Sequence, residues 1–564
     1  MSFNTRQISH SFWIDQINAG IDYRRKYAKE DKWNDYRSYY RGNWLPGVLP
    51  LNFFFMLMRA IVPRVYFKNP SVSIVPAMPG LECAVFAQLL ERIDNKLFTQ
   101  MKLKKQIKKM VQDSFMFGTG VGKLGLGGVY TPSPTYSGAV VPSLEKKGRI
   151  EYKAGTADNM PWFGRMQTGD FIVPSGCEDI DDAMWVAHRV ERYIDDVKSD
   201  PRLKFTKDLV ATRLTSYQRG GRVVNLQKPI DTIELFEIRD RKFGRVFVLS
   251  PDHQKILYEG PDLLQTREGF NFFPLIFNND DEVFWGVPDA AILEPQQLEA
   301  NEVRTQTMKH RRLTLLKIMY ETGAIEEPEL KKMLSESVGA GVQVNDITKV
   351  KPMQVAGIPA DLLASAEQVR ADIRETLGFS RNQMGELSQK SGDTTATEAS
   401  IVQMASEIRV DERRDIVADL LCNIANAMNE VLFKTWTGEQ IVDIAGPGGV
   451  RVWVAFSAEM LRGGAYEVSI DADTSLPLSR TAREQKAIQV YGLLKENPLV
   501  DPMLLTKYLL REMHGCQYDD LMRGLPTGVG LASPMNVGQF GQLLQNGQRL
   551  GLPMPAQNQD MIKK

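Results

Sequence analysis

Cysteine and histidine are scarce in this chain of 564 residues. The four cysteines lie far apart and form no CxxC pair, so the sequence predicts neither a disulfide framework nor a zinc knuckle. The five histidines are equally scattered, and no HExxH or triad pattern accompanies them. We therefore expect no metal and no cofactor. The cysteines are Cys83, Cys177, Cys422 and Cys516.

Net charge and long apolar runs are missing as well. Lys plus Arg and Asp plus Glu each number 69, which argues against long polybasic arms but leaves local patches open. The longest apolar stretch, residues 49–62, contains Asn52 and Arg59 and falls short of the ~20 residues that span a bilayer. The N-terminus has no apolar signal core. We expect a soluble protein without a membrane partner.

One segment comes close to a phosphate-binding signature. GTGVGKLG (118–125) has one residue too few for a P-loop, and Leu124 stands where a magnesium-binding Ser or Thr belongs. As a GxGxxG motif it has the wrong order, because a helix precedes it and strand-like residues follow. A helix end followed by close-packed strand glycines explains the segment better. The sequence does not indicate a nucleotide-driven enzyme.

Two acidic segments resemble metal sites without completing them. Glu178, Asp179, Asp181 and Asp182 precede His188, but no second histidine is near, so a solvated loop is favoured. Residues 471–475 begin like a calcium loop and lack its later Gly and Glu. No segment resembles an active site, and we expect that the protein is not an enzyme.

The strongest positive signal is an uninterrupted helical pattern over residues 394–436. Thr395 and Glu398 form a capping box at its start, and no Pro or Gly follows until Gly438. A helix of this length is roughly 60 Å long at ~1.5 Å per residue, far longer than the average helix. It predicts a rod that braces a large assembly.

The remaining patterns alternate between helical and strand-like, which predicts an α+β fold of several domains. Residues 8–41 combine aromatic and basic side chains, which suits either helix packing or, less well, stacking on nucleic acid. A second long helix is expected over 81–117, with its lysines solvated. Residues 288–313 predict a helix that is polar nearly all round, as for one packed against copies of itself or beside a water-filled channel. Further expected elements are strands at 230–242, 245–260, 315–320, 342–344, 350–355, 451–456 and 465–471, and helices at 328–337, 359–378, 480–496 and 501–513.

The order of these elements resembles the portal (head–tail connector) proteins of tailed double-stranded-DNA bacteriophages. WGVPDAAILEPQQLEANEVRTQTMKHRR (285–312) resembles the first stem helix of that family, with Gln297, Glu299 and Asn301 at its core. The polar loop before TATE (395–398) resembles the tunnel loop that leads into a long wing helix. The other similar segments are YRSYYRGNW (36–44), VERYIDDVK (190–198) and YEVSIDADTSLPLSRTAREQKA (466–487).

The resemblance implies a division of the chain into parts. The implied parts are a wing of N-terminal helices and strands (1–285), stem helix 1 (286–313), a small α/β clip (314–359), stem helix 2 (360–379), a tunnel loop (380–393), a long wing helix with wing strands (394–479), a helical crown (480–551) and a disordered tail (552–564).

The resemblance also implies a function without catalysis. A cyclic homo-oligomer, usually of twelve subunits, would sit at one vertex of the capsid in the virion, after assembly in the host cytoplasm. Double-stranded DNA would enter and leave through its channel, and terminase, tail adaptor, capsid and scaffolding proteins would be partners. The candidate channel residues are Glu294, Glu299 and Glu302 on the stem, and Arg381, Asn382, Gln383, Gln389 and Lys390 in the tunnel loop. The alternative is another structural virion component, of the tail or baseplate, without a DNA channel.

Overall fold

The chain divides into two compact units. The larger unit comprises Met1–Asp31, Ile61–Pro288 and Glu407–Lys564, and the smaller unit comprises Lys32–Ala60 and Asp289–Ser406. Both combine helices with strands, which confirms the predicted α+β class. The computed structural model describes residues 9–66, 72–76, 81–127, 140–144, 150–154, 161–211, 213–215, 217–219, 222–224, 230–267, 269–313, 317–333, 341–353, 360–377, 396–435, 440–445, 451–456, 466–470, 480–495, 509 and 535–536.

A six-stranded antiparallel sheet organises much of the larger unit. The strand predicted over 245–260 is in fact two strands, because Pro251 and Asp252 form a tight turn between them. In spatial order the strands are β13 (His253–Pro261), β12 (Arg245–Ser250), β11 (Ile230–Asp240), β7 (Trp185–Tyr193) and β6 (Phe171–Ile172), with β8 (Arg213–Thr215) also paired to β11.

The two faces of this sheet bury two separate apolar cores. Successive residues of a strand point to opposite faces, so Phe236 and Ile238 of β11 face one way and Ile233 and Leu235 the other. The first face packs on Trp13 and its neighbours in α1 (His10–Tyr27), and the second packs on α6 (Ile194–Ser199). Trp13, Tyr23, Trp33 and Tyr36 are buried, so these aromatic residues of 8–41 serve packing as favoured from the sequence, whereas Phe12 and Tyr27 are exposed.

A second, three-stranded sheet lies next to a helix pair. Its strands are β14 (Phe272–Ile276), β2 (Thr119–Leu126) and β5 (Pro161–Met166) in that order. The helix α5 (Leu103–Phe117) packs on β2 and contacts α4 (Leu81–Gln100). Buried Asp113 of α5 pairs with Arg165 of β5, which ties the helix to the sheet by charge as well as by packing.

Both of the long helices predicted near the N-terminus are interrupted. The first breaks after α1, where Lys29 has φ 52°, and continues as α2 (Trp33–Arg41). The second breaks between α4 and α5, where Lys102 has φ 53°. Left-handed backbone at a non-glycine residue is uncommon, so nothing in the sequence marked these two turns.

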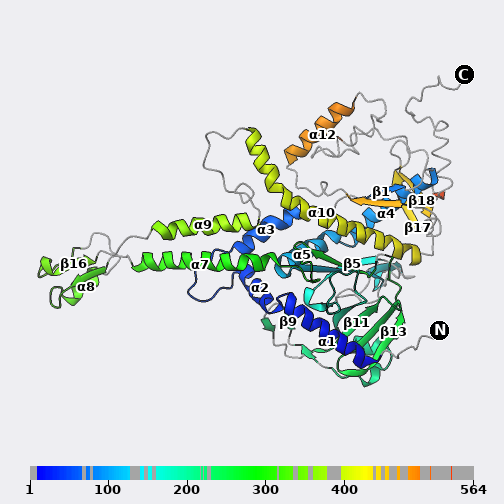
Figure 1. Cartoon of the computed structure of the whole chain (residues 1–564), viewed down its shortest axis with the longest axis horizontal. Helices are drawn as coiled ribbons and strands as arrows, with labels where there is room; N and C mark the ends of the chain where they lie inside the picture. The colour runs from blue at the N-terminus through cyan, green and yellow to red at the C-terminus, as the bar shows by residue number, and fades with distance from the viewer. Residues whose placement is uncertain are drawn as a thin grey trace. The chain divides into compact units, whose positions relative to one another are not determined.

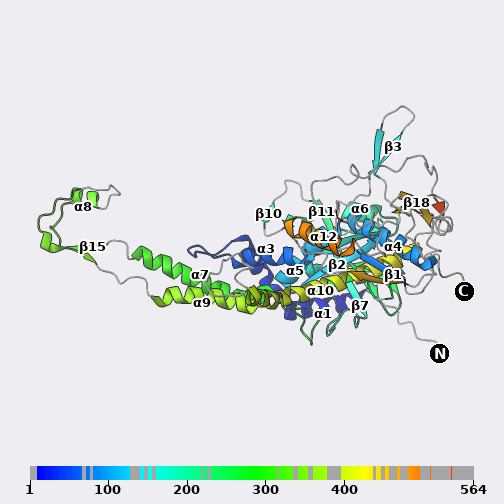
Figure 2. The same cartoon turned by 90° about the horizontal axis from the view of Figure 1, so that it is seen from above.

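The smaller unit contains the pair of helices predicted for the stem. The helix α7 (Asp289–Leu313) lies side by side with α9 (Ala360–Leu377) in both views (Figures 1 and 2). Between them in sequence, β15 (Lys317–Tyr320) pairs antiparallel with β16 (Val350–Met353), and α8 (Glu327–Met333) is a short helix. Residues 342–344 form no strand, in contrast to the prediction, and the short turn Ile347–Lys349 precedes β16.

The long rod is present as α10 (Ala396–Thr435), a helix of 40 residues. From Val410 onward its side chains pack into the larger unit, with Leu421, Ile424 and Met428 almost fully buried. The segment Val410–Lys434 is long and apolar enough to cross a membrane by length and composition, and it is the only such helix among the described residues. A buried core helix meets the same criterion, and 56% of an 18-residue apolar window within this segment is buried.

Several predicted segments lie outside the described residues. These are the cap residue Thr395, the loop 380–393, most of the crown 480–551 and the tail 552–564. The remaining elements are α3 (Phe53–Val65), β1 (Val72–Pro76) paired with β19 (Tyr466–Ile470), β3 (Val140–Leu144) with β4 (Ile150–Ala154), β9 (Tyr217–Arg219) with β10 (Arg222–Val224), the sheet of β17 (Gln440–Ala445), β18 (Arg451–Phe456) and β20 (Met535–Asn536), the helix α12 (Arg480–Leu494), and short 3-10 turns at Glu30–Lys32, Thr168–Asp170 and Thr206–Asp208.

Candidate functional site

One polar face of α7 holds the segment that leads into α3 by a ladder of hydrogen bonds. The side chains of Gln297, Asn301 and Thr305 lie four residues apart, so they stack on one helix face. They accept from the backbone N–H groups of alternate residues in the segment 49–53, each at 2.9 Å. The pairs are Phe53 N to Gln297 Oε1, Leu51 N to Asn301 Oδ1, and Leu49 N to Thr305 Oγ1.

The ladder is buried and internally connected. Gln297 and Asn301 are 0% and 2% exposed, and Gln297 Nε2 also donates to Asn301 Oδ1 at 2.9 Å. Thr305 Oγ1 donates in turn to the carbonyl oxygen of Asn301 at 2.7 Å. We expected the polar side chains of α7 to face water or another subunit. Some of them instead form hydrogen bonds within the same chain. Of the three core residues of the resemblance, Gln297 and Asn301 form the ladder and Glu299 does not.

The three candidate stem glutamates do not share one environment. The carboxylate of Glu294 accepts from Tyr39 Oη at 3.4 Å and lies 3.6 Å from Lys32 Nζ. Burial and the nearby Glu294 charge raise the pKa of Tyr39. Glu299 and Glu302 are exposed and lie one turn apart, where Glu302 accepts from Gln306 at 3.1 Å. Only these last two present carboxylates at the helix surface.

The side of α7 that meets α9 is apolar. Ala300 and Val303 are buried on α7, and Val369 and Ile373 are buried on α9. Their spacings of three and four residues give each helix one apolar stripe. As a result α7 has three faces: a buried polar face, a buried apolar face and an exposed acidic face. The five loop candidates, Arg381, Asn382, Gln383, Gln389 and Lys390, lie outside the described residues.

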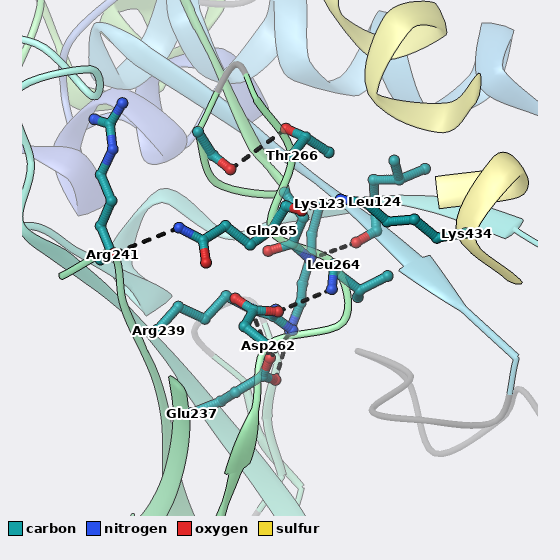
Figure 3. Close-up of polar contacts among 12 residues, drawn as sticks. Lys123, Leu124, Glu237, Arg239, Arg241, Asp262, Leu264, Gln265, Thr266 and Lys434 are labelled. Atoms are coloured by element: carbon teal, nitrogen blue, oxygen red, sulfur yellow. Dashed lines mark hydrogen bonds and ion pairs between the residues drawn. The ribbon is translucent and has the colours of Figure 1, made fainter. Parts of the chain in front are cut away.

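A second polar site is a buried cluster of charges between the two sheets of the larger unit (Figure 3). Glu237 of β11 accepts from Lys123 Nζ at 2.6 Å and from Arg239 at 2.7 Å. Arg239 also pairs with Asp262, and Lys123 Nζ lies 3.3 Å from Nδ1 of His188. Each of these side chains is nearly inaccessible to solvent.

The charges in this cluster compensate one another. Burial raises the pKa of Glu237, but the charges of Lys123 and Arg239 outweigh it and lower it to about 2. Burial lowers the pKa of Lys123 to about 8, against the opposing effect of Glu237. Burial and the Lys123 charge lower the pKa of His188 to about 3. At neutral pH Lys123 and Glu237 are thus ionised, and His188 beside them is neutral.

This cluster accounts for the near-match to a phosphate loop. Lys123, the counterpart of the phosphate-binding lysine, is 1% exposed and engaged by Glu237, so it is not presented to a nucleotide. Gly118 ends α5 with φ 82°, and a Cβ at Gly120 or Gly122 would overlap Met110 or Phe163. The expectation of a helix end followed by close-packed strand glycines is confirmed.

The loop that leaves the cluster also contacts the C-terminal part of α10. Asp262 accepts from the backbone N–H of Leu264 at 2.9 Å and so fixes the start of the loop. Two residues of α10 then bind this loop. Lys434 Nζ donates to the carbonyl oxygen of Gln265 at 2.7 Å (Figure 3). Glu430 accepts from the N–H of Arg267 at 2.8 Å. The loop that follows the cluster thereby holds the C-terminal part of α10.

The acidic segment near His188 is a surface loop, as expected. Glu178, Asp179, Asp181 and Asp182 are exposed, while His188 is buried in the charge cluster. Within the described part of the chain, no group of three or more His, Cys, Asp or Glu side chains is placed to hold a metal ion. Sequence reasoning missed the charge cluster, because its members are far apart in sequence and each lies in an ordinary strand pattern.

The paired helices α7 and α9, joined through an insert and followed by the rod α10, form the arrangement expected of a portal-type subunit. Residues 179–564 match the family model of phage P22-like portal proteins, which is more than half of the chain, so the chain belongs to that family. A comparison with curated proteins found no match. Members of the family are structural proteins, and membership implies a capsid-associated oligomer through which DNA passes.

Proposed function

We propose that the chain forms a closed ring, of about twelve copies, that serves as the DNA channel of one capsid vertex. The family match over residues 179–564 carries this proposal. Cyclic symmetry gives every subunit the same two neighbours and leaves no open edge, which a channel requires. Terminase during packaging, tail adaptor proteins afterwards, and capsid and scaffolding proteins during assembly in the host cytoplasm are the proposed partners.

The parts of the subunit have separate roles in this proposal. The helices α7 and α9 are the stem, residues 314–359 are the clip that docks terminase and adaptors, and residues 480–551 are the crown. Residues 1–285 and 394–479 are the wing, and residues 380–393 are the tunnel loop, with Arg381 and Lys390 as weak phosphate contacts. Support comes from the helix–insert–helix order and from the exposed acidic face of α7.

The electrostatics of the stem suit DNA that must slide. Each phosphate neutralised by a cation releases counterions and adds affinity, which acts as friction on a moving duplex. The exposed carboxylates of Glu299 and Glu302, repeated around a ring, would repel the backbone instead. Glu294 is the weakest of the three stem candidates, because its carboxylate already faces Tyr39 and Lys32.

Mass photometry and axial images of the purified protein test the ring. We expect a species near twelve times the 63.6 kDa mass of one chain, with a central hole. A single subunit-sized species at all micromolar concentrations contradicts the proposal. Rings of the Arg381→Ala/Lys390→Ala variant should form normally but should retain packaged DNA differently from the wild type. Unchanged DNA retention over a range of salt concentrations would show that Arg381 and Lys390 play no part in the mechanism.

A further inference from the structure

Phe205, in the larger unit, is an exposed aromatic residue that the backbone holds in an unfavourable conformation. Its φ is 59°, in the left-handed region that bulky residues rarely adopt, and its side chain is 52% exposed. The neighbouring backbone is fixed to the sheet, because the N–H of Lys204 donates to the carbonyl oxygen of Leu257 in β13 at 2.7 Å. Neither burial nor local preference accounts for a phenylalanine here. A strained residue that its surroundings hold in place indicates a functional role.

The charge beside Phe205 is predominantly positive. Lys204 and Lys207 lie next to it in sequence and are exposed, and Lys255 Nζ of β13 lies 4.9 Å from the centre of its ring. Asp208 is the one exposed carboxylate within five residues of Phe205 along the chain. We call Phe205 and these three lysines the basic aromatic surface.

A surface of the opposite character lies at the other end of β13. There the loops 178–184, 241–244 and 261–265 each expose one large apolar side chain. The three side chains are Met184, Phe243 and Leu263, which are 66%, 54% and 68% exposed. Backbone hydrogen bonds of 3.0 Å and 2.8 Å join the second loop to the first and to the third. These bonds run from Arg241 N to Met184 O and from Asp262 N to Gly244 O.

The charge beside these three loops is predominantly negative. Four exposed carboxylates precede Met184 in the first loop, whereas Lys242 is the one exposed cation of the three loops. The carboxylates are those of Glu178, Asp179, Asp181 and Asp182. We call these four residues, with Met184, Phe243 and Leu263, the acidic apolar surface.

We propose that the basic aromatic surface of one copy of the chain docks on the acidic apolar surface of the next copy, an inference that rests on the ring proposed above. Aromatic side chains inserted into apolar patches are typical centres of protein interfaces. Opposite charges at the rims fix the orientation and disfavour the pairing of like surfaces. Two different surfaces that meet head to tail generate a ring where the rotation closes.

The positions of the two surfaces favour a second copy as the partner. The part of β13 from Lys255 to Pro261 spans roughly 20 Å, so the two surfaces cannot meet within one chain. A different virion protein would need only one of them, whereas this chain has both, opposite in charge and apolar at the centre. A DNA duplex is disfavoured at the acidic apolar surface, because its carboxylates would repel phosphates.

An exchange of charge between two full-length variants tests this pairing. Lys204→Glu/Lys207→Glu makes both surfaces acidic, and Asp181→Lys/Asp182→Lys makes both basic. By mass photometry, we expect each variant alone to form rings at least about tenfold more weakly than the wild type. An equimolar mixture should restore rings in which the variants alternate, because every contact then joins opposite charges. Mixing cannot restore a variant that fails to fold.

Phe205→Gly separates docking from folding. Glycine adopts left-handed backbone without strain, so the melting temperature of the dissociated subunit should not fall. Loss of the aromatic ring should nevertheless weaken ring formation at least about tenfold. Phe12→Ala removes an aromatic side chain that is 48% exposed on α1 and serves as the matched control. It should leave ring formation within about twofold of the wild type.

The outcomes distinguish this inference from the proposed function. Wild-type protein that forms no ring contradicts the proposed function and the docking inference with it. Rings that Phe205→Gly and both charge-reversed variants form as readily as the wild type overturn the docking inference and leave the proposed ring intact. Loss of rings that the equimolar mixture does not restore also overturns it, because the two surfaces then do not pair with each other.

Discussion

At the scale of single residues, the carboxylate of Glu237 decides whether two buried cations are tolerated. Lys123 and Arg239 both donate to it, and neither is accessible to water. Removing one partner of a buried ion pair leaves an uncompensated charge, which is costlier than replacing the whole pair by apolar groups. Replacing the carboxylate of Glu237 by a neutral amide should therefore lower the free energy of unfolding strongly.

We expect Glu237→Gln to lower the free energy of unfolding by about 3–5 kcal/mol, measured by urea denaturation at pH 7. Glu259→Gln is the matched control in the same sheet, because its pair with Arg245 is exposed on both sides and should contribute only about 0–1 kcal/mol. Adding Lys123→Met to Glu237→Gln should restore part of the loss. Equal stabilities of the two single variants would disprove the role given to the cluster.

The same cluster makes stability depend on pH with a defined sign. The pKa of His188 falls from 6.5 to about 3 on folding, so between these values the unfolded chain binds a proton that the folded chain does not. Stability must therefore decrease as the pH drops through that window. The pKa of Glu237, lowered from 4.5 to about 2, adds a further loss below pH 4.5.

Thermal unfolding of wild type and His188→Gln between pH 7 and pH 4 measures this effect. We expect the melting temperature of the wild type to fall more steeply, because glutamine keeps a hydrogen-bond acceptor near Lys123 and takes up no proton. Parallel curves for the two proteins would show that His188 does not contribute to the acid response.

At the scale of elements, the sequence predicted those helices and strands whose limits have a chemical marker. The rod was predicted over 394–436 and is observed as Ala396–Thr435, since no Pro or Gly interrupts it. The helices 8–41 and 81–117 were predicted as continuous, because the left-handed turns at Lys29 and Lys102 carry no glycine or asparagine. Where a turn depends on tertiary packing, local sequence does not reveal it.

The junction between α5 and β2 shows the opposite case, because its turn requires glycine for two separate reasons. Gly118 has φ 82°, and a Cβ there would overlap the carbonyl oxygen of Gly286. Gly47 has a similar φ of 89° but has no atom within 4 Å of a Cβ. We expect Gly47→Ala to lower the free energy of unfolding by about 1–2 kcal/mol, because alanine is strained in a left-handed backbone conformation. Gly118→Ala should cost more than about 4 kcal/mol or prevent folding, as a thermal melt of both variants will show.

The hydrogen-bond ladder of α7 makes a prediction at the level of individual amides. Asn301→Ala removes the acceptor of the Leu51 N–H, and a buried unpaired donor costs about 1–3 kcal/mol. Hydrogen exchange should accelerate at Leu51 and its neighbours in 49–53. Gln306→Ala, on the exposed face of the same helix, should leave exchange there unchanged. Similar exchange in both variants would show that the ladder does not protect this segment.

At the scale of the whole molecule, the acidic face of the stem is the feature that the proposed channel uses. We expect Glu299→Lys/Glu302→Lys rings to assemble but to package DNA more slowly, with the defect largest at low salt, because added cations bind the moving backbone. Asp281→Lys/Glu282→Lys adds the same charge at exposed positions outside the stem and serves as the control. Equal packaging rates in a purified system would place Glu299 and Glu302 away from the channel.

The sequence allowed the candidate site to be predicted only in part, for physical reasons. Glu299 and Glu302 are exposed on one helix face, which their spacing allows, but their place in a channel stays a prediction. Glu294 was grouped with them because local sequence does not reveal its contacts with Lys32 and Tyr39, which lie more than 250 positions away. The charge cluster escaped notice for the same reason, since burial of Lys123 depends on strands contributed by β7 and β11. The loop residues Arg381 and Lys390 stay predictions.

The ladder between α7 and the segment 49–53 fixes the register of one against the other. Four residues of helix advance about 6.0 Å, and two residues of chain can advance up to about 6.6 Å, so alternate amides of the segment can reach every fourth side chain of α7. The segment is not fully extended, because the Phe53 N–H also donates to the carbonyl oxygen of Leu51 at 2.9 Å where α3 begins. The ladder has no further partners beyond its ends, since the next helix positions are Leu293 and Lys309 and Gly47 turns the segment away. A shift of α7 along the segment would therefore break all three hydrogen bonds together.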